Sequence, residues 1–135
     1  RMKMLVNSLM VGAGGFVGSV ARYLLSVALQ SYSFVFPAGT LLANVAGCFL
    51  IGVLSQITLS GSLSPGTRLA LGVGFCGGFT TASSFVYETA QFLREGEYFH
   101  GGSYVVGTLA ASFISFYAGV LLVKVVTKSA GDLWN

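Results

Sequence analysis

The sequence contains very few charged residues. Only 8% of its 135 residues are charged, seven of them basic and four acidic, whereas soluble domains carry about 25%. Hydrophobic residues make up 54% of the chain. The scarcity of charge excludes a soluble globular domain. No nucleic-acid partner is expected either, because the basic residues lie at the ends of apolar segments and form no stripe. The sequence therefore predicts an integral membrane protein that contacts the lipid bilayer.

Proline and cysteine are also scarce, with two residues of each. Pro37 and Pro65 fall in the linkers between apolar segments, where a residue that ends a helix is expected. Cys48 and Cys76 fall inside apolar segments and lack metal-ligand spacing. They are interpreted as small apolar residues and not as a disulfide.

Four apolar segments are long enough to cross a bilayer, which takes roughly 20 residues at 1.5 Å per residue. They cover about residues 4–29, 38–59, 67–97 and 101–127. The linkers are short, so the sequence predicts an all-α membrane protein with four transmembrane helices and one domain over residues 1–135. Basic residues favour cytoplasmic termini by only a few charges, which leaves insertion in both orientations open.

The third segment contains an interruption near its middle. Two glycines precede a run of hydroxyl residues, in the order Gly77-Gly78-Phe79-Thr80-Thr81-Ala82-Ser83-Ser84. Non-helical backbone at membrane depth persists only where it is buried in protein or lines a wet cavity or an ion site. The pattern predicts a functional break in this helix. The alternative is a glycine-rich packing kink without a ligand.

Three polar residues inside the spans are predicted to share one leaflet. Arg22, Asn44 and Glu88 each lie roughly 7–9 Å from the midplane by helical rise. This depth allows an Arg22–Glu88 contact or a shared polar network. The alternatives are snorkelling of Arg22 and a protonated or water-exposed Glu88. The Asn44 amide, with two donor hydrogens and one acceptor, is interpreted either as an anion ligand or as an interhelical hydrogen-bonding group.

The fourth segment carries hydroxyl groups along one helix face, at Tyr104, Thr108, Ser112 and Ser115. Hydroxyl groups along such a face could bind a small ion one after another as it crosses the membrane. Small residues from Gly107 to Gly119 also recur every four positions, which is typical of a packing seam. This seam, and another from Gly14 to Gly18, favours packing against a second copy. Phe85 follows the break directly, and its positive ring edge could face an anion, although packing is the commoner role.

Three motifs in this sequence resemble those of the bacterial Fluc fluoride-channel family, also called CrcB. In chain order they are Gly15-x-x-Gly18-x-x-x-Arg22-Tyr23, Gly39-Thr40-Leu41-x-x-Asn44-x-x-Gly47, and Gly77-Gly78-Phe79-Thr80-Thr81-x-Ser83-x-Phe85 followed by Glu88-Thr89. The resemblance covers nearly the whole chain, and the last motif is the most specific. The sequence departs from the family at Ala82, where a second phenylalanine of an aromatic box is usual.

The resemblance implies a passive fluoride-selective channel that exports fluoride across the bacterial inner membrane. It implies an antiparallel homodimer of dual topology, with a structural Na⁺ at its centre held by the backbone carbonyls of Gly77 and Thr80. Arg22 and Glu88 are expected in a vestibule or polar network. The implied fluoride pathway contains Asn44, Phe85, Tyr104, Thr108 and Ser112.

Two other functions compete with a fluoride channel. A small proton-coupled drug exporter would need a carboxylate in the first span, where Arg22 is the charged residue inside the segment. A scaffold protein would explain the packing seams but neither the break nor Asn44. The sequence contains no nucleophile–base pair, metal-ligand cluster or nucleotide-binding loop, so an enzyme is not predicted.

Overall fold

The computed structural model describes residues 1–134, and side chains through residue 131. All regular secondary structure in this part of the chain is helical. The three uninterrupted long helices are α1 (Met2–Ala28), α2 (Ala38–Leu59) and α6 (Tyr98–Trp134), and a short 3-10 turn, η1 (Gln30–Tyr32), precedes α2. The third span is segmented into α3 (Pro65–Arg68), η2 (Leu69–Cys76, a π-helix), α4 (Gly77–Phe79) and α5 (Ala82–Arg94).

Four helical stretches of the described chain are long and apolar enough to cross a membrane, as the sequence predicted. They are Met2–Ala28, Ala38–Leu59, Pro65–Arg94 and Tyr98–Gly131. The third ends earlier than predicted because Gly96 adopts a positive φ of 75°, a conformation that favours glycine. Its N–H and that of Glu97 close the helix on the carbonyls of Leu93 and Phe92. The chain is therefore a multi-pass membrane protein.

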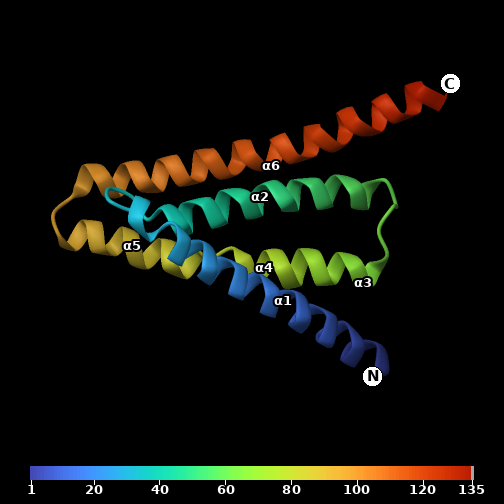
Figure 1. Cartoon of the computed structure of the whole chain (residues 1–135), viewed down its shortest axis with the longest axis horizontal. Coiled ribbons are helices and arrows are strands. Elements are labelled where there is room, and N and C mark those ends of the chain that lie inside the picture. Colours follow the sequence, from blue (N-terminus) through green and yellow to red (C-terminus); the bar gives the residue numbers. More distant parts are fainter. Residues whose placement is uncertain (135) are drawn as a thin grey trace.

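The helices pack in two pairs along the long axis of the molecule. In Figure 1, α2 runs beside α6, while α1 crosses the segmented third span. The amino-terminal part of α1 and the carboxyl-terminal part of α6 diverge from the centre at the end that holds both termini. The α6 helix has 37 residues, about 55 Å at 1.5 Å per residue, and so exceeds a hydrocarbon core of about 30 Å.

Glycine permits the close approach of both pairs. A methyl group at Gly18 would collide with the Phe75 carbonyl of the third span, and one at Gly119 would collide with the Phe49 carbonyl of α2. Ser115 also donates to the Val45 carbonyl of α2, at 2.8 Å. The two small-residue seams are thus used inside one chain. The seams therefore give no evidence of their own for a second copy, which stays a prediction, because sequence spacing identifies a seam but not its partner.

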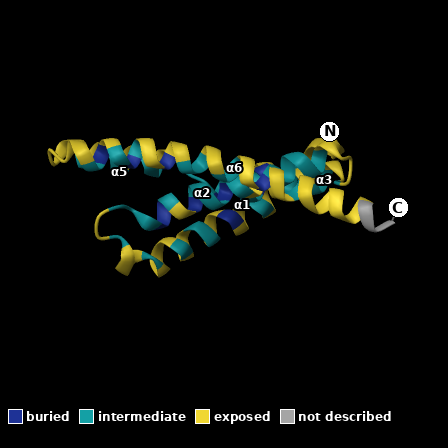
Figure 2. Ribbon diagram, turned by 90° about the horizontal axis from the view of Figure 1, so that it is seen from above, coloured by how far each residue is buried: buried dark blue, intermediate teal, exposed yellow. Residues whose placement is uncertain are grey.

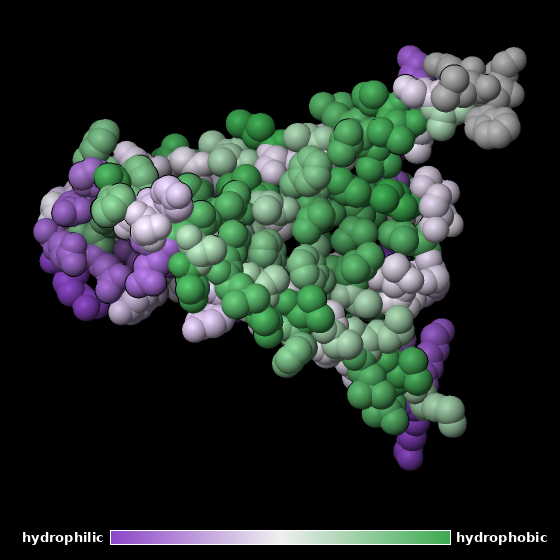
Figure 3. Space-filling model, viewed as in Figure 1, coloured by the Kyte–Doolittle hydropathy of each residue, from purple (hydrophilic) through white to green (hydrophobic). Residues whose placement is uncertain are grey.

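Large apolar side chains are mostly exposed in a single chain. The buried apolar residues are few, namely Ala43, Cys76, Phe79 and Tyr104, and Figure 2 shows how sparse the buried positions are along every helix. Figure 3 shows a broad hydrophobic surface over the middle of the molecule, with hydrophilic residues gathered at its ends. This distribution fits helices whose outer faces contact lipid or another protein surface.

Candidate functional site

The third span breaks at two residues, Thr80 and Thr81. Their φ/ψ angles are −85°/155° and −150°/114°, which is extended backbone between α4 and α5. The predicted break is therefore present, but it is narrower than the glycine run indicated, because Gly77 remains helical at −62°/−37°. Gly78 is needed for close packing instead, since a Cβ there would lie 2.6 Å from the Gly15 carbonyl oxygen of α1.

The Asn44 side chain of α2 pairs with the broken backbone. Its Oδ1 accepts from the Thr81 N–H at 2.7 Å, and its Nδ2 donates to the Thr81 carbonyl at 3.1 Å. The amide therefore replaces helical partners that the extended backbone cannot reach. Because a primary amide carries two donor hydrogens, one N–H of Asn44 remains available after these bonds form.

Thr81 also begins the second half of the span. Its Oγ1 accepts from the Ser84 N–H at 3.2 Å and caps α5. Thr80 remains tied to the first half, where its N–H and its Oγ1 both donate to the Cys76 carbonyl, at 3.0 Å and 2.8 Å. The sequence order Thr-Thr thus supplies one residue that closes α4 and one that opens α5.

These bonds free two carbonyls at the break. In a continuous α-helix, Gly77 C=O would accept from Thr81 N–H, and Thr80 C=O from Ser84 N–H. Both donors are diverted, to Asn44 and to the Thr81 hydroxyl respectively. Neutral carbonyl oxygens at membrane depth need another partner, and they are ligands that a hard cation accepts. The two carbonyls that the family resemblance implied as ligands are therefore chemically suited to a cation.

Arg22 and Glu88 do not contact each other. Arg22 Nε donates to the Gly78 carbonyl at 3.1 Å, and the side-chain ion pair found among the described residues is His100–Glu97. The predicted Arg22–Glu88 contact is thus replaced by a bond between α1 and the break. Helical rise places a residue at a depth but does not fix the direction in which its side chain points.

Glu88 instead joins α2 and α6. Its Oε1 accepts from Thr40 Oγ1 at 2.5 Å, and its Oε2 accepts from the Tyr104 hydroxyl at 2.6 Å. Thr40 and Tyr104 are only 8% and 2% exposed. Both carboxylate oxygens are therefore satisfied by hydroxyl groups, which is how a carboxylate can be kept inside a membrane protein.

A cavity of about 420 Å³ lies beside the break, between α2, α5 and α6. Asn44, Phe85, Thr108 and Ser112 all line it, together with Ala82. The fifth residue predicted for the pathway, Tyr104, does not line this cavity, but its ring centroid is 5.3 Å from that of Phe85. The structure thus brings four predicted pathway residues from three helices to one hollow.

The family model described as "CrcB-like protein, Camphor Resistance (CrcB)" matches residues 9–120, a range that contains every residue of this site. The chain belongs to the CrcB/FluC family. It is 50% identical over 118 residues, which cover 87% of this chain and 92% of the relative, to the fluoride-specific ion channel FluC of Prosthecochloris aestuarii. It is 44% identical over 119 residues, 86% of this chain and 97% of the relative, to that of Solibacter usitatus.

Thr40 is a site residue of this CrcB/FluC member that sequence reasoning did not single out. It lies one helical turn before Asn44, so both side chains leave α2 on the face toward the third span, where they bond Glu88 and Thr81. That four-residue spacing was the signal available in the sequence. Ser115, which shares the hydroxyl face with Ser112, is excluded from the site by its bond to Val45.

Proposed function

We propose that this protein is a passive, fluoride-selective channel that exports fluoride across the bacterial inner membrane. One observation carries the proposal: Asn44, Phe85, Thr108 and Ser112 line one cavity beside the broken helix. The names of the relatives support fluoride as the ion. No chemical step on a substrate is needed, so the proposed activity is transport and not catalysis.

The cavity offers weak donors, as an ion that must both enter and leave requires. Asn44 retains one amide N–H, Ser112 adds a hydroxyl, and Thr108 has a buried hydroxyl without a partner. The positive edge of the Phe85 ring adds a further favourable contact for an anion. Ala82 supplies no second ring here. In this proposal, hydrogen bonds from the polar donors therefore offset more of the free energy needed to remove water from fluoride.

The Thr40–Glu88–Tyr104 network has a structural role in the proposed pathway. Because its hydroxyls satisfy Glu88, the carboxylate can remain near the path while its charge is partly offset. It also fixes the Tyr104 ring beside Phe85. Arg22, anchored on the Gly78 carbonyl, contributes positive potential that attracts anions.

We further propose that two chains form an antiparallel homodimer of dual topology. The cavity is incomplete within one chain, because its lining residues Ala82 and Phe113 are exposed. Gly77 is also exposed, and nothing lies within 4 Å of the position its Cβ would take. A second copy placed over the break would cover these positions and close the wall.

A Na⁺ ion at the centre of this dimer would be held by the backbone carbonyls of Gly77 and Thr80. These oxygens fit such an ion because their helical donors are diverted, and two chains would provide four of them. When bound, Na⁺ supplies fixed positive charge near the anion path. No acidic side chain is needed, so the ion would be selected by the hardness of the ligands and the size of the site.

Fluoride efflux from proteoliposomes tests the proposal. Liposomes loaded with fluoride should empty rapidly when the protein is present, whereas those loaded with chloride should retain it. Uptake of a cationic dye driven by a proton gradient serves as the comparison for a drug exporter. Equal chloride and fluoride efflux, or dye transport without fluoride efflux, would contradict the proposed function.

A further inference from the structure

A second cavity, of about 510 Å³, lies between the end of α1, the start of α2 and the first half of α6. It is distinct from the cavity beside the break, since Thr108 is the single residue that lines both. Its volume is within the range that holds small-molecule ligands, roughly 300–1,000 Å³. Its lining residues are Leu29, Phe36, Ala38, Leu41, Leu42, Val45, Ser103, Tyr104, Gly107, Thr108 and Ala111.

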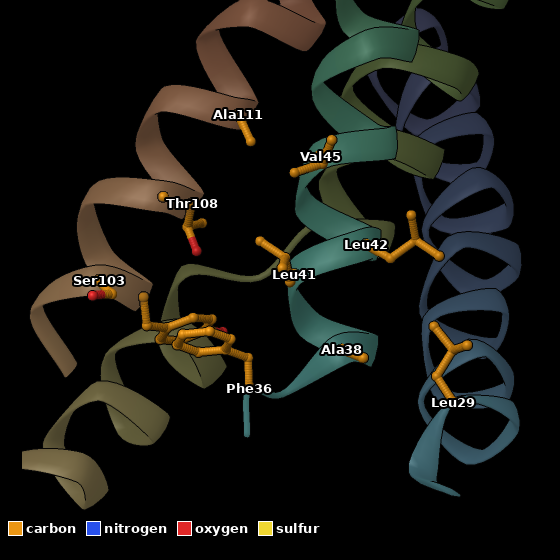
Figure 4. Close-up of a pocket in the computed structure, with 11 residues that line it drawn as sticks. Leu29, Phe36, Ala38, Leu41, Leu42, Val45, Ser103, Thr108 and Ala111 are labelled. Carbon is orange, nitrogen blue, oxygen red and sulfur yellow. The ribbon is translucent and has the colours of Figure 1, made fainter. Parts of the chain in front are cut away.

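The walls of this second cavity are mostly apolar and carry no charged group. Figure 4 shows Leu41 and Val45 of α2 facing Thr108 and Ala111 of α6 across the space, with the Phe36 ring at one end. The Phe36 and Tyr104 rings stack there, with centroids 6.1 Å apart and planes 19° apart. A lining of this kind accommodates a neutral, apolar body.

Thr108 provides an unsatisfied polar group in this apolar space. The residue is 5% exposed, and its Oγ1 has no hydrogen-bond partner. In Figure 4 the oxygen points into the space beside Leu41 and Phe36. A buried hydroxyl without a partner is costly. A water molecule needs two to four polar partners, and besides Thr108 this mostly apolar lining offers only the side-chain hydroxyls of Ser103 and Tyr104, of which Tyr104 already uses its donor on Glu88.

We propose that the second cavity binds a compact neutral molecule with an apolar body and a single hydrogen-bond acceptor. The acceptor receives the Thr108 hydroxyl, and the body fills the space between α2 and α6. Such a molecule partitions into lipid and can enter from the membrane, because Leu42 on the rim is 45% exposed. A plain acyl chain fits less well, since it would leave the hydroxyl unpartnered.

Occupancy of the second cavity should reduce fluoride transport, a consequence that rests on the proposed function. The single Thr108 hydroxyl can donate only one hydrogen bond. A ligand that accepts this bond holds the hydroxyl in the second cavity, so it cannot turn toward the cavity beside the break, where Asn44 and Ser112 would share the ion with it. The ligand is therefore an inhibitor that acts through a wall common to both cavities.

Adamantanone and adamantane are suitable probes, because they share a compact cage and differ in one carbonyl. Binding is measured by equilibrium partitioning into proteoliposomes, after subtraction of protein-free liposomes. The wild-type protein should bind the ketone roughly three- to tenfold more tightly than the hydrocarbon, as expected for one net hydrogen bond. In Thr108→Val, which keeps the shape of the side chain, this ratio should fall to about one.

Thr127→Val is the matched control, because Thr127 lies on the same helix and its hydroxyl bonds only backbone carbonyls of that helix. Its ratio of ketone to hydrocarbon binding should equal that of the wild type. Ala111→Phe places a ring in the second cavity without touching the cavity beside the break, and it should abolish binding of both probes. Equal binding of the two probes to the wild type, or unchanged binding to Ala111→Phe, would overturn the proposal.

Fluoride efflux supplies the second readout. Adamantanone should slow efflux through the wild type and have no effect on Ala111→Phe. Efflux that continues unchanged at saturating ketone would overturn the inhibitory part. A wild-type protein that carries no fluoride at all would contradict the proposed function, while the binding comparison would still decide whether the second cavity takes its ligand.

Discussion

At the scale of the residue, Asn44 is the side chain on which the break depends most. It gives the Thr81 backbone one acceptor and one donor, and both would otherwise be unpaired at membrane depth. Asn44 also lines the cavity that holds Phe85 and Ser112. One side chain thus couples the stability of the extended segment to the proposed ion path.

Asn44→Asp should therefore nearly abolish fluoride efflux. A carboxylate can still accept from the Thr81 N–H, but its second oxygen would face the Thr81 carbonyl, where acceptor meets acceptor. It also places negative charge beside an anion path, where repulsion is strong at low dielectric. We expect efflux below roughly one hundredth of wild type, equivalent to about 2.7 kcal/mol.

Asn7→Asp serves as the control for this variant, because it makes the same change near the start of α1, far from the break along the chain. It should retain most of the wild-type efflux. Efflux through Asn44→Asp equal to that through Asn7→Asp would remove Asn44 from the pathway.

Gly77 and Thr80 contribute backbone oxygens, so their side chains should matter in different ways. A Cβ at Gly77 meets nothing within 4 Å in one chain, and any harm from Gly77→Val must come from a second copy. We expect this variant to lose fluoride efflux or to shift the dimer toward monomer in light scattering. Thr80→Ser keeps the bond to Cys76 and loses one methyl, worth about 0.8 kcal/mol, and should retain both properties.

At the scale of the element, side chains from neighbouring helices stabilise the broken form of the third span. Arg22 of α1 bonds the Gly78 carbonyl, Asn44 of α2 bonds Thr81, and Glu88 of α5 is bonded by Thr40 and Tyr104 from α2 and α6. Three helices thus supply polar partners to one span. Such contacts are favourable in a bilayer, where water cannot replace them.

Tyr104→Phe should destabilise the helix bundle by about 1 kcal/mol, because it leaves a part-buried carboxylate oxygen without its donor. Thermal unfolding in detergent measures the effect, and Tyr117→Phe is the control, since Tyr117 is 60% exposed on the same helix.

Thr40→Val should act similarly, and the double variant with Tyr104→Phe should be non-additive because both hydroxyls bond one carboxylate. Strict additivity would show that the network does not act as a unit.

Most elements were predictable from local signals, whereas their partners were not. Hydropathy located four spans, and the run from Gly77 to Ser84 located the break. The break is confined to two residues because Asn44, 37 residues away in sequence, accepts the hydrogen bond of the Thr81 N–H. The Arg22–Glu88 contact that helical rise allowed is not formed, since Arg22 bonds the Gly78 carbonyl instead. Depth follows from helical rise, whereas direction depends on tertiary packing that spacing alone does not encode.

At the scale of the whole molecule, a single chain has too little interior to enclose an ion path. The cavity beside the break is bounded on one side by exposed residues such as Phe113, which is 65% exposed. Figure 3 also shows a broad hydrophobic surface over the middle of the molecule. A second, inverted copy would complete the wall and bring two sets of break carbonyls together.

Dual topology predicts that one position near a terminus is reachable from both sides of the membrane. Ser129→Cys, in a background of Cys48→Ala and Cys76→Ala, should be labelled about equally by an impermeant maleimide added to intact cells and to inverted vesicles. Ser129 is exposed near the end of α6, so access should not be limiting. Labelling from one side only would leave a parallel arrangement and contradict the proposed dimer.

The central claim is that fluoride passes through the cavity lined by Asn44, Phe85, Thr108 and Ser112, and a thiol modification at Ser112 tests it most directly. Ser112→Cys, without Cys48 and Cys76, is treated in detergent with methyl methanethiosulfonate, checked for complete modification by mass spectrometry, and reconstituted. Fluoride efflux should be close to wild type before modification and lost after it, while modified Ser129→Cys should remain active. Full-rate efflux through completely modified Ser112→Cys would contradict this pathway.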